Sequence, residues 1–137
     1  MRVLIDTQIF LWGLLEPERL RQGVKDFLKN TLENEMYFSH VSSWEIATKY
    51  GIKKLDIPDI PERYVPNRVK EAGFLHLPIK LEHVLQVHGL PPVHKDPFDR
   101  LLVSQARVEG LTILTSDPHF AKYKINVLNV FDFKIKN

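Results

Sequence analysis

The sequence predicts an α/β protein built on a mainly parallel central sheet with helices on both faces. Short apolar runs rich in β-branched residues alternate with longer segments of helical periodicity, the pattern of parallel strands joined by crossover helices. The first run, RVLID at residues 2–6, is apolar up to its terminal acid, as expected of a strand buried on both faces. The length of 137 residues suits one domain spanning residues 1–137 with a core of its own.

Each expected strand is followed by a segment that carries the start or stop signals of a helix. Strands are expected at residues 2–6, 36–39, 74–78, 111–115 and 125–130. Helices are expected at residues 7–15, 17–35, 42–51, 61–73, 80–89, 97–110 and 117–123. In the second of these helices, a helical spacing behind Pro17 is kept by Leu20, Val24, Phe27, Leu28 and Leu32. Pro66 leaves the first half of the helix at 61–73 open, because proline removes a helical hydrogen bond.

The composition excludes several classes of site. The absence of cysteine removes disulfides, thiolate nucleophiles and cysteine-type zinc sites, so a metal would have to be bound by oxygen or imidazole. The net charge of +2 is compatible with an anionic partner but is too small to require one. No apolar stretch reaches the ~20 residues of a spanning helix, and Asp6 interrupts the apolar start. We therefore expect a cytoplasmic protein with no membrane contact.

Four acidic residues fall at the starts of expected helices. The carboxyl ends of parallel strands lie along one edge of a sheet, so these side chains are expected to meet there: Asp6, Glu45, Asp99 and Asp117. Three of them also have a purely structural explanation. Glu45 would complete a capping box with Ser42, and Asp6 and Asp117 would each cap the helix that follows.

The DPFD stretch at residues 96–99 helps to separate the two explanations. Asp96 before Pro97 is a natural N-cap, which leaves the Asp99 carboxylate free in the first turn. Alternatively Asp99 only favours the helix dipole, a contribution of about 0.3–1 kcal/mol. That accounts for one acid but not for four like charges at one edge, which need a neutralising partner. Carboxylates without cysteine suit Mg²⁺ or Mn²⁺, and such a site performs metal-assisted attack of water on a phosphodiester.

Four motifs in chain order carry a resemblance to a known family. LIDTQIFLW, SSWEIATKYGIKKL, DPFDRLLVSQA and ILTSDPHF resemble the PIN-domain nucleases, especially the small prokaryotic members of the VapC toxin type. The similarity extends from Met1 to about Asn129. It implies a parallel α/β/α sheet and cleavage of RNA with Mg²⁺ or Mn²⁺ held by acidic residues.

Carried over motif by motif, the resemblance implies catalytic and metal-binding roles for Asp6, Glu45, Asp99 and Asp117. Thr7 matches a frequent hydroxyl beside the first acid, and Ser116 occupies a polar position beside the last. Gln8 and Ser116 stand where many relatives have His and Asn, positions that are not usually metal ligands. The resemblance further implies a homodimer and a cognate antitoxin bound near the acids, for which a helix-in-groove contact would be suitable.

Other side chains remain open to two interpretations. Arg100 could steady a carboxylate, meet a phosphate or form a local ion pair. Five basic residues could follow a nucleic-acid backbone or form a solvated face: Lys49, Lys53, Lys54, Arg63 and Arg68. Core packing is expected of Trp12, Trp44, Phe98 and Phe120. The six histidines are scattered, and their spacing does not predict a zinc site.

Three functions are therefore weighed. The first is a metal-dependent endoribonuclease, the toxin of a toxin–antitoxin pair. The second is a non-catalytic RNA-binding or partner-binding module of the same fold. The third is phosphoryl chemistry on an aspartate, as in phosphatases with an early D-x-D-x-T motif, and Gln8 in place of the second acid counts against it.

Overall fold

The structure is a computed structural model that describes residues 1–132, and these residues form a five-stranded parallel sheet. Its strands are β1 (Arg2–Ile5), β2 (Glu35–Ser39), β3 (Leu75–Leu77), β4 (Thr112–Thr115) and β5 (Val127–Asn129). In space the order is β3-β2-β1-β4-β5, and each neighbouring pair is parallel. All five predicted strands are present, and the predicted fold class is confirmed.

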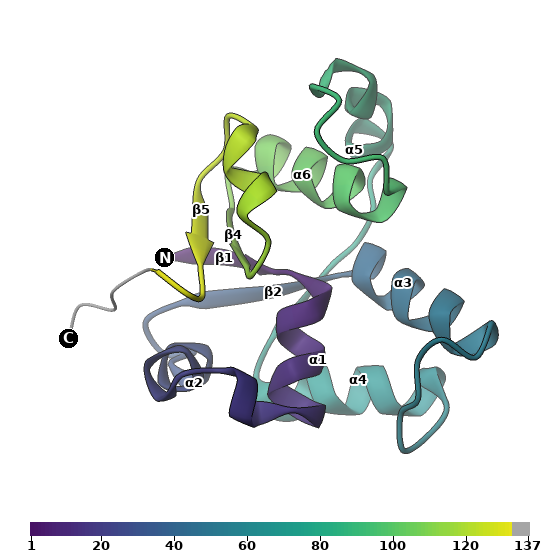
Figure 1. The fold of residues 1–137 in the computed structure, drawn as a ribbon, viewed down its shortest axis with the longest axis vertical. Coiled ribbons are helices and arrows are strands. Elements are labelled where there is room, and N and C mark those ends of the chain that lie inside the picture. Colours follow the sequence, from purple (N-terminus) through teal and green to yellow (C-terminus); the bar gives the residue numbers. More distant parts are fainter. Residues whose placement is uncertain (133–137) are drawn as a thin grey trace.

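Helices cover both faces of this sheet. The α-helices are α1 (Thr7–Leu15), α2 (Gln22–Lys29), α3 (His40–Gly51), α4 (Pro61–Ala72), α5 (Leu81–Leu85) and α6 (Pro97–Glu109). Short 3₁₀ segments are η1 (Pro17–Arg19), η2 (Gln86–Gly89) and η3 (Pro118–Lys122). Figure 1 shows α5 and α6 on one side of the sheet and α1, α2 and α4 on the other. Among residues 1–132, no helix has the length and apolar character that crossing a membrane requires.

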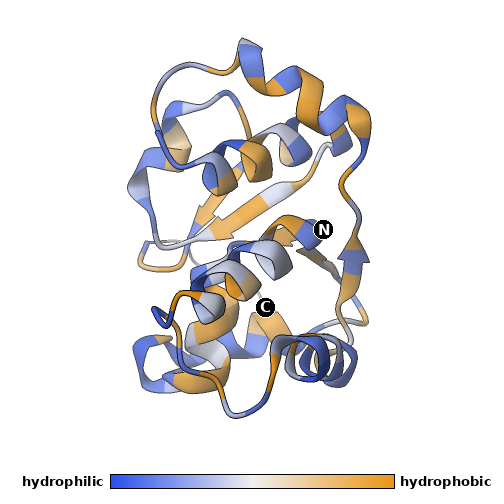
Figure 2. Ribbon diagram, turned by 90° about the vertical axis from the view of Figure 1, so that its right-hand side faces the viewer, coloured by the Kyte–Doolittle hydropathy of each residue, from blue (hydrophilic) through white to orange (hydrophobic). Residues whose placement is uncertain are grey.

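The central strand β1 sends alternate side chains into two separate cores. Val3 and Ile5 pack with apolar residues of α1, α2 and α4, whereas Leu4 packs with those of α6. The register carries the alternation to β4, since Leu4 pairs with Ile113 and Ile5 with Leu114. In Figure 2 the strands are mainly hydrophobic, and the surrounding helices carry the hydrophilic segments. The central strands β1 and β4 are therefore buried on both faces over most of their length, as predicted for β1, whereas the edge strands β3 and β5 are partly exposed.

The predicted helix at residues 17–35 is divided and shorter than expected. It consists of η1 followed by α2, which ends at Lys29 and leaves Leu32 99% exposed. The helix stops at Asn30, whose backbone leaves the helical region with a ψ of 67° and whose side-chain oxygen accepts a hydrogen bond from Glu33 N at 3.4 Å. Such local bonds compete with helix continuation. The prediction that Leu32 extends the apolar face was therefore wrong.

The helix left open at Pro66 is continuous. α4 runs from Pro61 through Pro66 to Ala72 and ends at Gly73, whose φ of 74° lies in the left-handed region that glycine adopts without strain. The buried side chains of Tyr64, Val65 and Val69 anchor this helix on the sheet. Tertiary packing thus outweighs the hydrogen bond that the proline removes.

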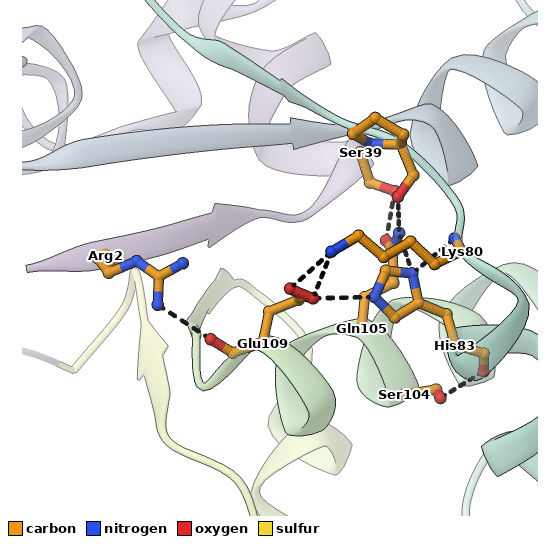
Figure 3. A network of polar contacts seen from close by, with 8 residues as sticks. Arg2, Ser39, Lys80, His83, Ser104, Gln105 and Glu109 are labelled. Atoms are coloured by element: carbon orange, nitrogen blue, oxygen red, sulfur yellow. Dashed lines mark hydrogen bonds and ion pairs between the residues drawn. The ribbon is translucent and has the colours of Figure 1, made fainter.

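A buried polar network ties α6 to the carboxyl ends of β2 and β3 (Figure 3). The Ser39 hydroxyl donates to the side-chain oxygen of Gln105, and the amide nitrogen of Gln105 donates to the Pro78 carbonyl at 3.2 Å. The Ser39 oxygen also caps α3 by accepting a hydrogen bond from Val41 N at 2.9 Å. The network therefore fixes where α3 begins, and with it the position of Glu45.

Candidate metal centre

The strand order reverses between β1 and β4, and two of the predicted acids lie at this reversal. From β1 the chain first moves outward through β2 and β3, and later returns to the other side of β1 as β4. In parallel sheets, ligands bind outside the carboxyl ends of the strands at such a point. Asp6 follows β1 directly, and Asp117 lies two residues after β4. The Asp6 amide donates to the Leu114 carbonyl at 3.0 Å, which joins the two strand ends.

Asp6 occupies the N-cap position of α1, but its carboxylate makes no capping hydrogen bond. Instead one carboxylate oxygen, Oδ2, accepts a hydrogen bond from the Thr115 hydroxyl at 2.7 Å. The residue is only 7% exposed. Burial raises the pKa of Asp6 to about 6, and the charges of Glu45 and Asp117 raise it as well, against the lowering effect of Thr115. The capping explanation for Asp6 is therefore wrong.

The two aspartates of the DPFD stretch divide their roles as predicted. Asp96 caps α6, because its Oδ1 accepts a hydrogen bond from Phe98 N at 2.8 Å. Asp99 is the third helical residue, and no donor within residues 1–132 bonds to its carboxylate. Burial raises the pKa of Asp99 to about 7, and the charges of Asp6, Asp96 and Glu45 act in the same direction. The Asp99 carboxylate thus makes no capping hydrogen bond, and it lies close enough to the other acids for their charges to raise its pKa.

Glu45 does not form the predicted capping box. α3 begins at His40 with Ser39 as its cap, so Ser42 is already the third helical residue and Glu45 lies in the second turn. Glu45 is 7% exposed, and its Oε2 accepts a hydrogen bond from the ammonium of Lys49 at 2.5 Å. The predicted capping box was wrong because the helix is capped by Ser39, three residues before Ser42. The carboxylate instead forms an ion pair inside the helix.

A hydroxyl pair links the segments that carry Asp6 and Glu45. The buried Thr7 donates through its hydroxyl to the Ser42 hydroxyl oxygen at 2.7 Å. Thr7 begins α1 directly after Asp6, and Ser42 precedes Glu45 by almost one turn of α3. The Thr7 hydroxyl, expected beside the first acid, thus connects α1 to α3.

Asp117 is held at both of its carboxylate oxygens. As predicted, it caps the following helical turn, with Oδ1 accepting from His119 N at 2.8 Å. The His119 ring nitrogen Nδ1 lies 2.8 Å from the same oxygen, and His94 Nε2 lies 2.8 Å from Oδ2. Burial raises the pKa of Asp117, but the hydrogen bonds of His119 and His94 together bring it below its usual value. Asp117 is therefore ionised where Asp6 and Asp99 resist ionisation.

The hydrogen bonds of Tyr123 determine which ring nitrogen of His94 carries the proton. That nitrogen is Nε2, which faces Asp117. The Tyr123 hydroxyl oxygen accepts from His94 N at 3.1 Å and lies 2.8 Å from His94 Nδ1. In neutral His94 the hydroxyl hydrogen is donated to Nδ1, so Nε2 carries the proton that is donated to Asp117. The two rings also stack, with an interplanar angle of 8°. Tyr123 thereby orients His94 toward the acid.

Three residues at this edge were not recognised from the sequence as site residues. Thr115 ends the LTILT strand, so the rule that located Asp117 could have found it. His94 comes from the loop before α6 and His119 from η3, and neither has a periodic or spacing signal that points to an acid. Only the packing of these segments brings the imidazoles to Asp117.

The remaining predicted supporting residues lie beside this centre. The Arg100 guanidinium donates to the carbonyls of Val87, Leu90 and Pro91 at 2.9–3.3 Å, and so holds the loop that leads to His94. It pairs with no carboxylate among the described residues. Ser116 is partly buried between Thr115 and Asp117.

The aromatic residues divide between core and surface. Phe120 is fully buried, as predicted, and Trp12 and Phe98 are partly buried against the two cores. Trp44 is 49% exposed, so its expected core packing was wrong. Ile46, two residues later on the same helix, is buried in the core that contains Ile9 and Phe10, and Trp44 is not part of that core.

The donor set fits a hard divalent cation, although residues 1–132 contain no group of three His, Asp or Glu side chains placed to hold one. Carboxylate oxygens are the ligands that Mg²⁺ and Mn²⁺ prefer, and buried like charges gain from a cation. Three of the four acids already have protein partners: Thr115 engages Asp6, Lys49 engages Glu45, and two histidines engage Asp117. An ion would compete with these contacts, whereas among residues 1–132 nothing engages Glu45 Oε1 or the Asp99 carboxylate.

Known proteins share both sequence and fold with this chain. Ribonuclease VapC16 of Mycobacterium tuberculosis is 33% identical over 57 residues, which are 42% of this chain and 39% of that protein. A chain in the crystal structure of VapBC2 from Rickettsia felis bound to a promoter DNA fragment has a TM-score of 0.73 at 14% identity, covering 94% of this chain and 98% of that one. FitAcB from Neisseria gonorrhoeae contains a chain with a TM-score of 0.65 at 19% identity, covering 96% and 99%. At sequence identities of 14% and 19%, the similarity to these two structures shows a shared fold alone. A comparison with protein families matches residues 3–126 to the PIN domain, and the chain therefore belongs to the PIN domain family.

Proposed function

We propose that this protein is an Mg²⁺- or Mn²⁺-dependent endoribonuclease that hydrolyses RNA phosphodiester bonds, as the toxin of a toxin–antitoxin pair. The main support is the set of acids at the end of β1 and in the first turn of α6, where the pKa of Asp6 is raised to about 6 and that of Asp99 to about 7. Buried like charges oppose folding, and a cationic ligand explains why they are present. The name of the relative Ribonuclease VapC16 supports RNA as the substrate class.

Each acid has a role in this proposal. Asp6, Asp99 and Asp117 would hold the ion, and Glu45 would hold it directly or through water while helping to orient the nucleophile. A bound divalent ion would lower the pKa of that water and polarise the phosphate. Thr115 orients Asp6, and His94 and His119 keep Asp117 ionised. Once Glu45 turns to the ion, the Lys49 ammonium is available to the phosphate.

Cleavage of a mixed RNA pool tests the function. Native protein, Asp6→Asn and Asp99→Asn are compared with Mg²⁺, with Mn²⁺ and with EDTA. We expect cleavage by the native protein with either ion and none with EDTA, and a loss of at least about 100-fold in both variants. Equal activity in all three proteins would refute the mechanism. Salt-sensitive RNA binding without cleavage under any divalent ion would favour the non-catalytic module instead.

An antitoxin partner is part of the proposal, and its candidate contact is a cavity that none of the four acids lines, in place of the position near the acids that the resemblance implies. A cavity of about 630 Å³ is lined by residues of α1, α2 and α4, including Ile9, Phe10 and Leu14. Arg68 also lines it, and its buried Nε has no hydrogen-bond partner among residues 1–132. An apolar helix face with one acceptor for Arg68 would fit. A further similar structure, VapBC-5 from Mycobacterium tuberculosis, is described as a member of the VapBC family of toxin–antitoxin systems, which supports a protein partner.

Co-purification from the native host tests this partner. We expect a small protein to accompany the native chain, and Leu14→Glu to release it while RNA cleavage persists. Retention of the partner by Leu14→Glu would place its contact elsewhere.

The proposed homodimer has a candidate surface of its own. Exposed apolar side chains on and around β3 and α5 are Leu75, Leu81, Val84 and Leu85. Such a group is typical of a protein interface. Light scattering should show a dimer of the native chain and a monomer of Leu85→Arg. A monomeric native chain would remove the dimer.

A toxin acting on cellular RNA would work in the cytoplasm.

A further inference from the structure

Two adjoining cavities lie between α6 and the loop that joins η3 to β5. The larger has a volume of about 470 Å³ and the smaller one of about 310 Å³, and Arg107, Lys124 and Ile125 line both. The larger volume falls within the range of about 300–1,000 Å³ that is typical of small-molecule sites. None of the four acids lines either cavity, so these cavities are separate from the candidate metal centre.

The charged side chains of residues 1–132 that line the two cavities are all basic. Arg107 comes from the last turn of α6, and Lys122 and Lys124 lie on either side of Tyr123. Within residues 1–132, none of these three side chains forms an ion pair or a hydrogen bond. Cations gathered at one cavity repel one another, and an anion bound between them would offset that repulsion.

The wall beside these cations is apolar. Leu90, Pro91, Val103 and Ile125 line the larger cavity, and Leu90 and Val103 are also part of the core around α6. Inorganic phosphate would use the cations and leave this wall in contact with water. A mononucleotide would use both, because it joins a base to a phosphate that carries a charge of about −1.5 to −2 at neutral pH.

The two residues that line both cavities and carry a charge are suited to the phosphate. The Arg107 guanidinium can donate two parallel hydrogen bonds to phosphate oxygens, and the Lys124 ammonium adds a point charge. Both side chains are exposed, so their charges are available to a ligand from solvent. A phosphate at this position leaves the larger cavity for the base.

We propose that the two cavities form a binding site for a free mononucleotide, with its phosphate between Arg107 and Lys124 and its base against the apolar wall of the larger cavity. The site does not depend on the proposed nuclease function, because it uses none of the acids. The Tyr123 ring lines the larger cavity while its hydroxyl contacts His94 Nδ1. A bound nucleotide would therefore lie beside the residue that orients His94 toward Asp117.

Calorimetric titrations in EDTA test the site. The probes are AMP and UMP as a purine and a pyrimidine nucleotide, with inorganic phosphate and adenosine as their separate parts. EDTA removes the divalent ions that would bind a phosphate at the acids. Arg107→Gln and Lys124→Gln each remove one cation at an exposed position. Lys54→Gln is the matched control, since Lys54 is exposed and lines neither cavity.

We expect the native chain to bind at least one of the two nucleotides at one site, at least about tenfold more tightly than inorganic phosphate or adenosine. Arg107→Gln and Lys124→Gln should each weaken this binding by about 3- to 30-fold. Lys54→Gln and Asp6→Asn should bind the nucleotide as the native chain does. Circular dichroism confirms that each variant is folded.

Four results would overturn the site. No binding of either nucleotide up to about 1 mM would exclude it. Equal affinities for the nucleotide and inorganic phosphate would show that the apolar wall takes no part. An equal loss in Lys54→Gln would indicate unspecific attraction to a basic protein, and a changed affinity in Asp6→Asn would assign binding to the acids.

A competition experiment distinguishes a free nucleotide from a nucleotide within RNA. The probe is a single-stranded oligoribonucleotide of mixed sequence, added in EDTA to the complex with the bound nucleotide. Failure of the oligoribonucleotide to displace the nucleotide supports the proposal. Displacement with a higher affinity than that of the nucleotide, lost in Arg107→Gln, would make the cavities part of an RNA-binding surface and overturn it.

Discussion

Two groups of acidic side chains lie in opposite electrostatic surroundings. One group comprises Asp6 after β1 and Asp99 in the first turn of α6, and the other is Glu109 at the end of α6. Glu109 Oε2 accepts a hydrogen bond from His83 Nε2 at 3.3 Å, and the Lys80 ammonium lies 3.4 Å away (Figure 3). The hydrogen bond from His83 and the contacts of Lys80 lower the pKa of Glu109. Burial and neighbouring acids instead raise the pKa of Asp6 to about 6 and that of Asp99 to about 7.

This difference distinguishes a structural network from a candidate site. Around His83 donors meet acceptors: Nδ1 accepts from Lys80 N at 3.0 Å, which leaves the hydrogen of Nε2 for Glu109. Folding alone explains such an arrangement. Around Asp99, folding leaves a carboxylate without a donor among like charges, and a ligand is needed to explain it. Changing one side chain in each region should therefore have opposite consequences.

The largest effect is expected from Asp99→Asn. RNA cleavage with Mn²⁺ should fall by at least about 100-fold, because a proposed metal ligand is lost. In EDTA at pH 8 the free energy of unfolding should rise, because a carboxylate repelled by Asp6 and Asp96 is gone. Cleavage rates and urea denaturation measure the two quantities.

The matched control is Glu109→Gln, for which the sign of the stability change reverses and the effect on cleavage disappears. It should lower the free energy of unfolding and leave the cleavage rate per folded molecule unchanged. A destabilised Asp99→Asn with full activity would remove the distinction between the two regions.

His83→Ala should cause the largest loss of stability, about 2–4 kcal/mol. His83 is completely buried, and its removal leaves Lys80 N without its acceptor and the Glu109 carboxylate with the Lys80 ammonium alone. Urea denaturation measures the loss. The exposed His88, in the 3₁₀ segment that follows α5, supplies the control, since His88→Ala should change stability by less than about 0.5 kcal/mol. Equal stability of both variants would show that the network does not support the fold.

The pH dependence should also have opposite signs in the two regions. Affinity for Mn²⁺, measured by calorimetry, should rise about tenfold to a hundredfold between pH 5.5 and 7.5, because Asp6 and Asp99 must release protons before binding. In EDTA, these raised pKa values contribute stability at low pH that is lost as the pH rises through about 6 to 7. The lowered pKa of Glu109 contributes stability at neutral pH that is lost as the pH falls through that value. An affinity that does not vary over this range would show that neither acid binds the ion.

The smallest effect is expected from Lys49→Met. The Lys49 ammonium occupies Glu45 Oε2, so its removal should raise the affinity for Mn²⁺ by up to about 5-fold, the size of a partly exposed ion pair. The same variant should raise KM for RNA, because a cation near the phosphate is lost. Lys54→Met, at an exposed lysine beyond α3, should change neither quantity. A weaker Mn²⁺ affinity in Lys49→Met would mean that the lysine assembles the site instead of competing for it.

The elements that were predicted correctly depend on signals a few residues long. The apolar run at residues 2–5 needs only its own composition to indicate a strand buried on both faces. Asp96 before Pro97 identifies a helix start without any other part of the chain, and the capping bond to Phe98 N is present. Where two local signals competed, the prediction failed. Ser42 and Glu45 match a capping box, but Ser39 starts the helix because it is anchored by Gln105, 66 residues away.

The sequence by itself determined the alternation of strands and helices, and it predicted four acids at one edge of a parallel sheet. Both follow from periodicity and chain order, which are local properties. Only the tertiary structure decided what each carboxylate contacts: Thr115 for Asp6, Lys49 for Glu45 and the imidazoles for Asp117. It also decided that Trp44 stays half exposed while Phe120 is buried. These outcomes depend on how helices from distant parts of the chain pack against one another, and no short sequence pattern specifies that packing.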